Sequence, residues 1–194
     1  MIEKLKEYAL ENYIPIVRDE TSLKLIEECK KLKPKNILEI GTAIGYSGLL
    51  MLENCDATLY TIEKNEERFK EAEHTFKECK FSNRVKQFLG DAYNVLQELS
   101  KDSLKFDLIF LDGPKGQYIK YLPYLKSMLN IGGEIFADNV LMHGLIENYD
   151  QVTHKNRTMV RNMKKFNETI LGDEDFTSQM YEIEDGFIIA YKNK

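Results

Sequence analysis

The sequence predicts an α/β fold: a mostly parallel sheet with helices on both faces and an antiparallel hairpin at the carboxyl end. Three observations support this prediction. Short apolar runs alternate with helical segments at the spacing of strand–helix–strand units. The first apolar run ends at a glycine turn that leads directly into a helix. The last two runs are joined by Asp185-Gly186, a pair typical of tight hairpin turns.

The chain begins with helical segments that precede the first strand. Residues 1–12 predict a charged amphipathic helix and not a signal peptide. Residues 13–17 are expected to be extended, because the proline among them disfavours helix in the residue before it. A second helix is expected over roughly 20–32. We interpret residues 1–33 as a helical segment that covers the site, within one domain spanning 1–194.

The strands that follow are short and apolar, as in a buried parallel sheet. They are expected at 36–41, 58–63, 85–89, 106–112 and 134–137. The helices that alternate with them and follow them are expected at 45–53, 66–80, 92–99, 115–129 and 155–171. The final hairpin is expected to pair strands 176–183 and 187–191. A parallel sheet closed by such a hairpin is the outline of the Rossmann-like class I methyltransferases, and it differs from the usual dinucleotide-binding fold.

Composition narrows the class of protein. The chain has 194 residues, of which 43% are hydrophobic and 30% charged, an ordinary globular profile. A formal net charge of −5 argues against a generally basic nucleic-acid coat, although it leaves room for a local basic face. Cys29, Cys55 and Cys79 are widely spaced, so we expect reduced thiols and a cytoplasmic location. No apolar run is long enough to span a bilayer, and no membrane partner is expected.

The stretch 36–47 places a glycine turn between a strand and a helix. Gly41 and Gly45 permit backbone conformations and close approaches that a Cβ atom would block. A ligand over this turn would meet free N–H groups at the start of the helix. Open α/β sheets bind their ligands at such strand ends. A plain strand-to-helix connection also favours glycine, so the turn alone leaves both interpretations open.

Two acidic residues end the next strands of the predicted sheet. Glu63 lies 22 residues after Gly41, where a carboxylate can accept hydrogen bonds from both ribose hydroxyls of an adenosine ligand; a solvated carboxylate is the alternative. Asp91 could accept from an amine such as that of adenine while Ala92 leaves room for the ring, or it could cap the following helix. Ser47 could contact a ligand carboxylate or pack within its helix. These residues indicate an adenosine-type ligand without excluding structural roles.

Asp112 and the pair Asp138-Asn139 end two further strands and are expected to lie side by side at the carboxyl edge of the sheet. Two carboxylates and an amide offer three hard oxygen ligands, which suit Mg²⁺ better than zinc. Lys115 begins the next helix against the preference of the helix dipole, which suggests a functional role. Near a divalent cation its pKa would fall, and a neutral amine could accept a proton. A solvated surface lysine is the alternative.

A basic segment follows between His154 and Asn167, and it contains no acidic residue. Its cations are Lys155, Arg157, Arg161, Lys164 and Lys165. They could meet the phosphates of a nucleic acid, or they could be the solvated face of a helix whose apolar residues pack inward. A second basic cluster, at residues 30–35, is equally ambiguous.

Three other classes of protein would carry different motifs or would not need these. An NAD-dependent dehydrogenase would carry Gly-x-Gly-x-x-Gly, but Ala43 stands where the middle glycine is needed. A serine hydrolase would carry Gly-x-Ser-x-Gly, which the stretch 45–48 misses by one residue. A non-enzymatic RNA-binding module would keep the basic surface without needing the three oxygen ligands to converge, and it remains the alternative to an enzyme.

Taken together, the stretch 37–47, the Asp112…Lys115 segment and Asp138-Asn139 resemble the cation-dependent O-methyltransferases related to catechol O-methyltransferase. Within that group the chain is most similar to the bacterial tRNA 5-hydroxyuridine methyltransferases. The stretches that carry this closer resemblance are 14–17, 115–118, 138–141 with His143-Gly144, and 156–158 with 160–162.

The resemblance implies an activity and a set of site residues. It implies that S-adenosylmethionine is held by Val17, Gly41, Ser47, Glu63, Asp91, Ala92 and Asp112. It implies that Mg²⁺ is held by Asp112, Asp138 and Asn139, and that Lys115 is the base. The implied substrate is 5-hydroxyuridine at the wobble position of tRNA, with the anticodon loop as partner; a small catechol or phenol is the runner-up. Relatives are commonly dimers, so a homodimer is expected.

Overall fold

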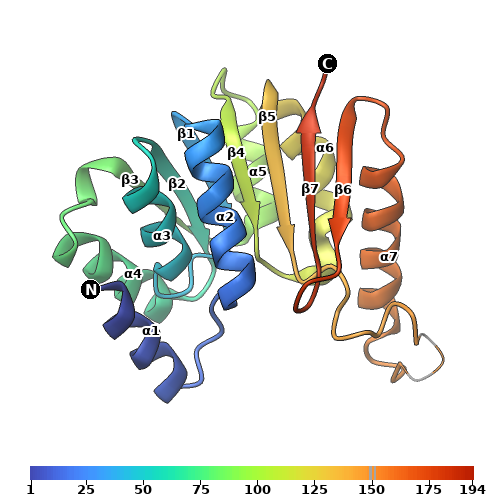
Figure 1. Cartoon of the computed structure of the whole chain (residues 1–194), viewed down its shortest axis with the longest axis horizontal. Coiled ribbons are helices and arrows are strands. Elements are labelled where there is room, and N and C mark those ends of the chain that lie inside the picture. The colour runs from blue at the N-terminus through green and yellow to red at the C-terminus, as the bar shows by residue number, and fades with distance from the viewer. Residues whose placement is uncertain (149, 151) are drawn as a thin grey trace.

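A seven-stranded sheet runs through the centre of the molecule, with helices packed on both of its faces (Figure 1). The computed structural model describes residues 1–148, 150 and 152–194. The strand order is β3-β2-β1-β4-β5-β7-β6, and only β7 runs antiparallel to its neighbours in the described sheet. The predicted fold class, a mostly parallel sheet closed by an antiparallel hairpin, is confirmed.

The elements alternate along the chain as the apolar runs predict. The strands are β1 (Asn36–Ile40), β2 (Thr58–Glu63), β3 (Val85–Leu89), β4 (Phe106–Leu111), β5 (Leu129–Asp138), β6 (Phe176–Tyr181) and β7 (Phe187–Lys192). The α-helices are α1 (Ile2–Glu11), α2 (Asp19–Leu32), α3 (Tyr46–Asn54), α4 (Glu66–Glu78), α5 (Ala92–Leu99), α6 (Tyr118–Met128) and α7 (Arg157–Leu171). Two short 3₁₀ turns, η1 (Ser82–Arg84) and η2 (Lys115–Gln117), complete them. Among the described residues, no helix has the length and apolar character needed to cross a bilayer.

Both faces of the central strands are buried, because successive side chains point to opposite faces of a sheet. Ile37 and Phe110 pack toward α1, α2, α3 and α4, whereas their neighbours Leu38 and Ile109 pack toward α5, α6 and α7. All four side chains are fully buried. The continuous apolar runs in the sequence therefore reflect a sheet that is covered on both sides.

Most element boundaries agree with the sequence prediction within two residues, and two starting positions differ by more. The strand expected at 134–137 begins earlier, at Leu129, because its first residues pair with Phe106 before a register shift in the ladder. The helix expected at 115–129 begins only at Tyr118, after the 3₁₀ turn. The Gln117 N–H donates to the Pro114 carbonyl at 2.9 Å, which closes a tight turn where the α-helix was expected to start.

The first turn of α2 is capped from the far end of the chain. Glu184, in the turn between β6 and β7, accepts hydrogen bonds from the N–H groups of Glu20 and Thr21 at 3.2 and 3.0 Å. It also accepts from the Thr21 hydroxyl at 2.7 Å. A carboxylate is favourable there, because the first N–H groups of a helix lack partners within the helix and carry partial positive charge. The hairpin turn thereby fixes the start of α2.

One carboxyl group lies in the interior of the sheet beneath the glycine turn. Glu39 of β1 is fully buried, and it accepts hydrogen bonds from the hydroxyls of Ser47 and Thr61, both at 2.6 Å. Burial raises its pKa to about 7, with smaller contributions from the charges of Asp112 and Glu63, although the two hydrogen bonds act in the opposite direction. Glu39 therefore loses its proton in the native protein only near neutral pH.

This burial predicts a pH-dependent effect of Glu39→Gln. The native protein favours the protonated form of Glu39, and this preference stabilises the fold. The stabilisation is complete at pH values below the pKa of Glu39 in the unfolded chain, and it is lost as pH rises through about 7, its pKa in the native protein. Glutamine keeps the shape and cannot ionise. We expect the unfolding free energy of the variant, relative to that of the wild type, to increase from about pH 5 to about pH 8. The increase should be on the order of 3 kcal/mol.

Urea unfolding at the two pH values measures this difference. Glu73→Gln, on the exposed face of α4, is the control and should change little with pH. A difference between the Glu39 variant and the wild type that is the same at both pH values would contradict the prediction.

Candidate active site

The glycine turn after β1 lies against the end of β4. Gly41 adopts φ +103°, and a Cβ atom there would lie 2.4 Å from the Asp112 carbonyl oxygen. The Gly41 N–H donates to the Ile62 carbonyl at 3.0 Å, so the same residue is also tied to β2. Only glycine allows both this conformation and this approach. The close contact brings the ends of β1, β2 and β4 together.

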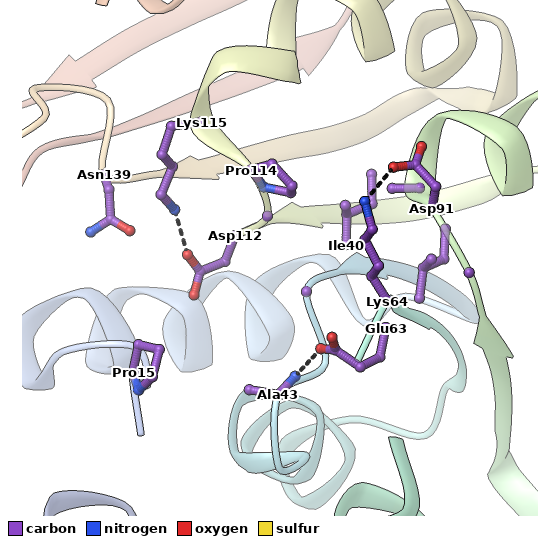
Figure 2. Close-up of a pocket in the computed structure, with 15 residues that line it drawn as sticks. Pro15, Ile40, Ala43, Glu63, Lys64, Asp91, Asp112, Pro114, Lys115 and Asn139 are labelled. Atoms are coloured by element: carbon purple, nitrogen blue, oxygen red, sulfur yellow. Dashed lines mark hydrogen bonds and ion pairs between the residues drawn. The ribbon is translucent and has the colours of Figure 1, made fainter. Parts of the chain in front are cut away.

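A cavity of about 350 Å³ opens over this turn (Figure 2). Its wall includes seven residues that the sequence singled out: Gly41, Glu63, Asp91, Ala92, Asp112, Lys115 and Asn139. They come from the carboxyl ends of all five parallel strands, as expected for an open α/β sheet. The structure therefore brings together most of the residues predicted for a donor and cation site.

Glu63 and Asp91 each make structural contacts while they line the cavity. Glu63 accepts from the N–H groups of Ala43 and Asn65, both at 2.8 Å. Asp91 accepts from the Tyr93 N–H at 3.1 Å and so caps α5, and its other oxygen lies 3.3 Å from the Lys64 ammonium. The cap that the sequence left as an alternative is thus present, and Asp91 lines the cavity beside Lys64 (Figure 2).

Two predicted donor residues lie outside this wall. Ser47 is 7% exposed, and its hydroxyl donates to Glu39 beneath the turn. Val17 is 3% exposed and packs in the core between the sheet and the first helices. The neighbouring Pro15, from the extended segment before α2, lines the cavity instead. The N-terminal segment therefore borders the site through Pro15.

The predicted cation ligands follow two paired strands. Leu111 pairs with Ala137, so the next residues of the two strands, Asp112 and Asp138, are neighbours at the edge of the sheet. Asp138 is 2% exposed, and burial raises its pKa to about 7, with a further contribution from the charge of Asp112. Asn139 follows in a left-handed conformation, φ +56°, and lines the cavity.

This donor set fits a hard divalent cation. Two neighbouring carboxylates, with the charge of Asp112 raising the pKa of Asp138, and an amide beside them offer the oxygen ligands that Mg²⁺ prefers. In the part of the chain that the structure describes, no group of three His, Cys, Asp or Glu side chains is placed to hold a metal ion. The predicted set has only two such side chains, because its third member, Asn139, is an amide.

Lys115 and Tyr118 complete the polar cluster at the end of β4. The Lys115 ammonium donates to Asp112 at 2.6 Å and to the Tyr118 hydroxyl at 3.0 Å (Figure 2 shows the first contact). Burial lowers the pKa of Lys115, but Tyr118 and Asp112 together outweigh it and hold the pKa above its ordinary value. In this structure Lys115 is paired with the Asp112 carboxylate.

Tyr118 is a site residue to which the sequence analysis gave no role. Its hydroxyl is fully buried, donates to the Leu111 carbonyl at 2.9 Å and lies 3.3 Å from the Asp138 carbonyl. One side chain thus joins the ends of β4 and β5 and positions Lys115. Lys115 and Tyr118 are three residues apart, so they lie on one helical turn. This spacing is the signal in the sequence that predicts a contact between them.

A second cavity of about 550 Å³ adjoins the first. Four residues line both of them: Pro15, Asp112, Lys115 and Asn139. The remaining wall combines apolar and polar side chains: Ile16, Arg18, Met142, His143, Leu145, Asn156, Met159 and Asp185. Two ligands bound in these cavities would therefore meet at Asp112, Lys115 and Asn139.

Comparison with known sequences assigns the chain to a family. The sequence profile of the O-methyltransferase family matches residues 2–193. This chain belongs to that family. Among curated relatives of this O-methyltransferase, catechol O-methyltransferase from Niastella koreensis is 30% identical over 115 residues, which are 58% of this chain and 52% of the relative. The match thus spans about half the length of that enzyme.

Solved structures resemble the O-methyltransferase over nearly its whole length. A Staphylococcus aureus protein, provisionally assigned as a caffeoyl-CoA O-methyltransferase, has a TM-score of 0.91 at 32% identity, covering 98% of this chain and 91% of its own. A Podospora anserina methyltransferase solved with bound SAH has a TM-score of 0.80 at 26% identity, covering 92% and 80%. The fold is that of class I methyltransferases.

The close contact at Gly41 predicts unequal costs for two glycine substitutions. Gly132 also has a positive φ, +78°, but a Cβ atom there would meet nothing within 4 Å. Gly132→Ala should therefore cost only the backbone strain, about 1–2 kcal/mol. Gly41→Ala should cost a further 1–3 kcal/mol, roughly, because the new methyl group must displace the Asp112 carbonyl.

Denaturant unfolding of the two variants gives the comparison directly. Equal destabilisation by both substitutions would show that the approach of the turn to β4 is not a constraint on this fold.

Proposed function

We propose that this O-methyltransferase uses S-adenosylmethionine and Mg²⁺ to methylate 5-hydroxyuridine at the wobble position of tRNA, giving 5-methoxyuridine. The observation that carries the proposal is the meeting of two cavities at Asp112, Lys115 and Asn139. One cavity suits the donor and the other the acceptor, and the residues between them suit a cation and an ionising hydroxyl.

The first cavity supports binding of S-adenosylmethionine. Glu63 and Asp91 present carboxylates where ribose hydroxyls and the adenine amine would lie, and Ala92 leaves space for the ring. The SAH bound to the Podospora methyltransferase supports the same ligand class for this family member. Gly41 allows the ligand to approach the backbone of the turn.

Mg²⁺ would be held by Asp112, Asp138 and Asn139. When bound, such an ion favours the ionised form of an acceptor hydroxyl and fixes it through a neighbouring oxygen. In 5-hydroxyuridine that neighbour is the 4-carbonyl oxygen, and in a catechol it is the second hydroxyl. The predicted ligand set cannot distinguish these acceptors, so the choice must come from the rest of the second cavity.

Methyl transfer requires the acceptor oxygen, the methyl carbon and the sulfonium sulfur in line, so positioning supplies much of the rate. Pro15 and Lys115 border both cavities and would hold the two reactants against each other. The Lys115 ammonium stabilises a developing oxyanion through its charge. Loss of the acceptor proton is thereby assisted electrostatically, whichever group receives it.

The basic face of α7 supports an RNA substrate. We define it by four exposed cations: Arg157, Arg161, Lys164 and Lys165. None of the ion pairs formed among the described residues involves them. Asn156 and Met159, at the start of the same helix, line the second cavity. Phosphates bound along α7 would thus lead to the acceptor position.

The start of α7 is also joined to the segment that carries Lys115. The Asn162 side chain donates to the Gly116 carbonyl at 2.9 Å, and a Cβ atom on Gly116 would lie only 3.3 Å from the Met159 side chain. A nucleic acid held by the basic face would therefore be placed in a fixed relation to the reacting groups. We further propose a cytoplasmic homodimer; the three free cysteines support a reducing location.

The substrate proposal predicts a defined product. Purified protein with S-adenosylmethionine and Mg²⁺ should convert 5-hydroxyuridine to 5-methoxyuridine in tRNA from a strain that lacks this methylation. Mass spectrometry of the tRNA nucleosides measures the conversion, and a chelator should abolish it because the predicted ligands are hard oxygens. Catechol is assayed in parallel. Methylation of catechol with no change in tRNA would support the small phenolic acceptor instead.

The basic face predicts a selective effect of charge reversal. Arg157→Glu with Arg161→Glu should reduce kcat/KM for tRNA about 10-fold or more, because repulsion replaces attraction at the phosphates. The double variant should methylate a small acceptor, which enters the cavity without contacting α7, at a rate close to that of the wild type.

The matched control reverses two lysines on or near α4, Lys77→Glu with Lys80→Glu, which are exposed and lie outside both cavities. An equal loss with both double variants would indicate a general charge effect and would count against α7 as the RNA-binding face.

A further inference from the structure

Tyr13 follows the end of α1 in a conformation that tyrosine seldom adopts. Its φ is +52°, in the left-handed region. Its N–H donates to the Leu10 carbonyl at 3.3 Å, and the next N–H, of Ile14, donates to the Ala9 carbonyl at 2.8 Å. This pair of hydrogen bonds is a Schellman motif, whose left-handed position is usually glycine and sometimes asparagine. Tyrosine is therefore an unfavourable choice for the backbone here, because its Cβ atom makes the left-handed conformation strained.

The side chain of Tyr13 does not offset this strain within the fold. It is 94% exposed, more than any other large apolar side chain that the structure describes. Its neighbours supply the apolar contact of the motif, since both Ala9 and Ile14 are buried in the core. Strained backbone positions cluster at functional sites. The conformation and the exposure together suggest that the ring serves a ligand and not the fold.

Tyr13 lies beside the wall that the two cavities share. Pro15, two residues further along, lines both cavities, and Ile16 lines the second (Figure 2 shows Pro15). Two residues of extended chain span at most about 7 Å, so the backbone of Tyr13 is close to this wall. Ile14 between them is buried, which anchors the segment to the core. The ring can therefore contact a substrate that extends out of the second cavity.

An unpaired nucleobase is the ligand class that this exposed ring suits. RNA loops are recognised largely through bases that stack on aromatic side chains. The basic face of α7 leads to the second cavity through Asn156 and Met159, whereas Pro15 and Ile16 border that cavity from the end of α1. Because α1 and α7 pack on opposite faces of the sheet, a loop with one base in this cavity would have the basic face on one side and Tyr13 on the other (Figure 1).

We propose that Tyr13 is a stacking platform for an unpaired base of the RNA substrate, next to the uridine that is methylated. The ring holds the flanking base at the rim while its neighbour enters the second cavity. This contact favours a polynucleotide over a small catechol, which does not extend beyond the cavity. The inference rests on the proposed function, since the stacked base belongs to the same loop as the acceptor.

The first test uses the absence of tryptophan from this chain. Tyr13→Trp introduces a single indole, and a base stacked on an indole quenches its fluorescence. The probe is an anticodon stem–loop that contains 5-hydroxyuridine, added with Mg²⁺ and with SAH in place of the methyl donor. We expect saturable quenching. The matched control is Ile131→Trp, because Ile131 is 73% exposed and lies near the start of β5, at the opposite edge of the sheet. Its fluorescence should change little.

The second test separates binding of the base from support of the fold. Tyr13→Asn removes the ring and places a residue that tolerates the left-handed conformation. Its urea midpoint should equal or exceed that of the wild type, while KM for the tRNA should rise about 10-fold, within the range that one base–aromatic stack contributes. Tyr13→Phe keeps the ring and should restore most of kcat/KM.

An unchanged KM in Tyr13→Asn, or quenching no greater in Tyr13→Trp than in Ile131→Trp, would overturn the inference. Loss of a dimer in Tyr13→Asn with no change in KM would overturn it as well, and would assign the ring to a contact between two copies of the chain. Quenching in Tyr13→Trp without methylation of the tRNA by the wild type would support stacking on RNA and refute the proposed reaction.

Discussion

The site depends on one close approach, between the glycine turn after β1 and the end of β4. The Asp112 carbonyl occupies the space that any side chain at Gly41 would need. This contact places Asp112 within reach of the ends of its neighbours β1 and β5, and it leaves the turn open to a ligand. The first cavity, which Asp112, Lys115 and Asn139 line, lies over this contact.

Polar groups at the site are held by partners that are distant in sequence. Tyr118 joins the ends of β4 and β5 through their carbonyls, and Glu39 supports the turn from below through Ser47 and Thr61. Asn162 ties α7 to the turn that carries Lys115. Each contact satisfies a buried group that would otherwise cost free energy. The same contacts make the site rigid, which the in-line geometry of methyl transfer requires.

The fold and half of the site could be predicted because they depend on local patterns. Apolar runs reveal buried strands, and polar residues at strand ends must meet at one edge of the sheet, as Glu63, Asp91 and Asp112 do. The pairing of His143 with Asp185 could not be predicted in this way, because it depends on left-handed residues after Asn139 and on the turn of a distant hairpin. The place of Ser47 could not be predicted either, because its hydroxyl donates to the buried carboxyl group of Glu39 and no local pattern in the sequence indicates that contact.

The cap that Glu184 places on α2 has a consequence for the order of assembly. Glu20 and Thr21 obtain this partner only after the ribosome has passed a residue more than 160 positions further along the chain. Until then the start of α2, and with it the wall formed by Pro15 and Arg18, lacks its anchor. The segment that borders both cavities through Pro15 therefore obtains this anchor only when the hairpin turn at the carboxyl end of the chain is present.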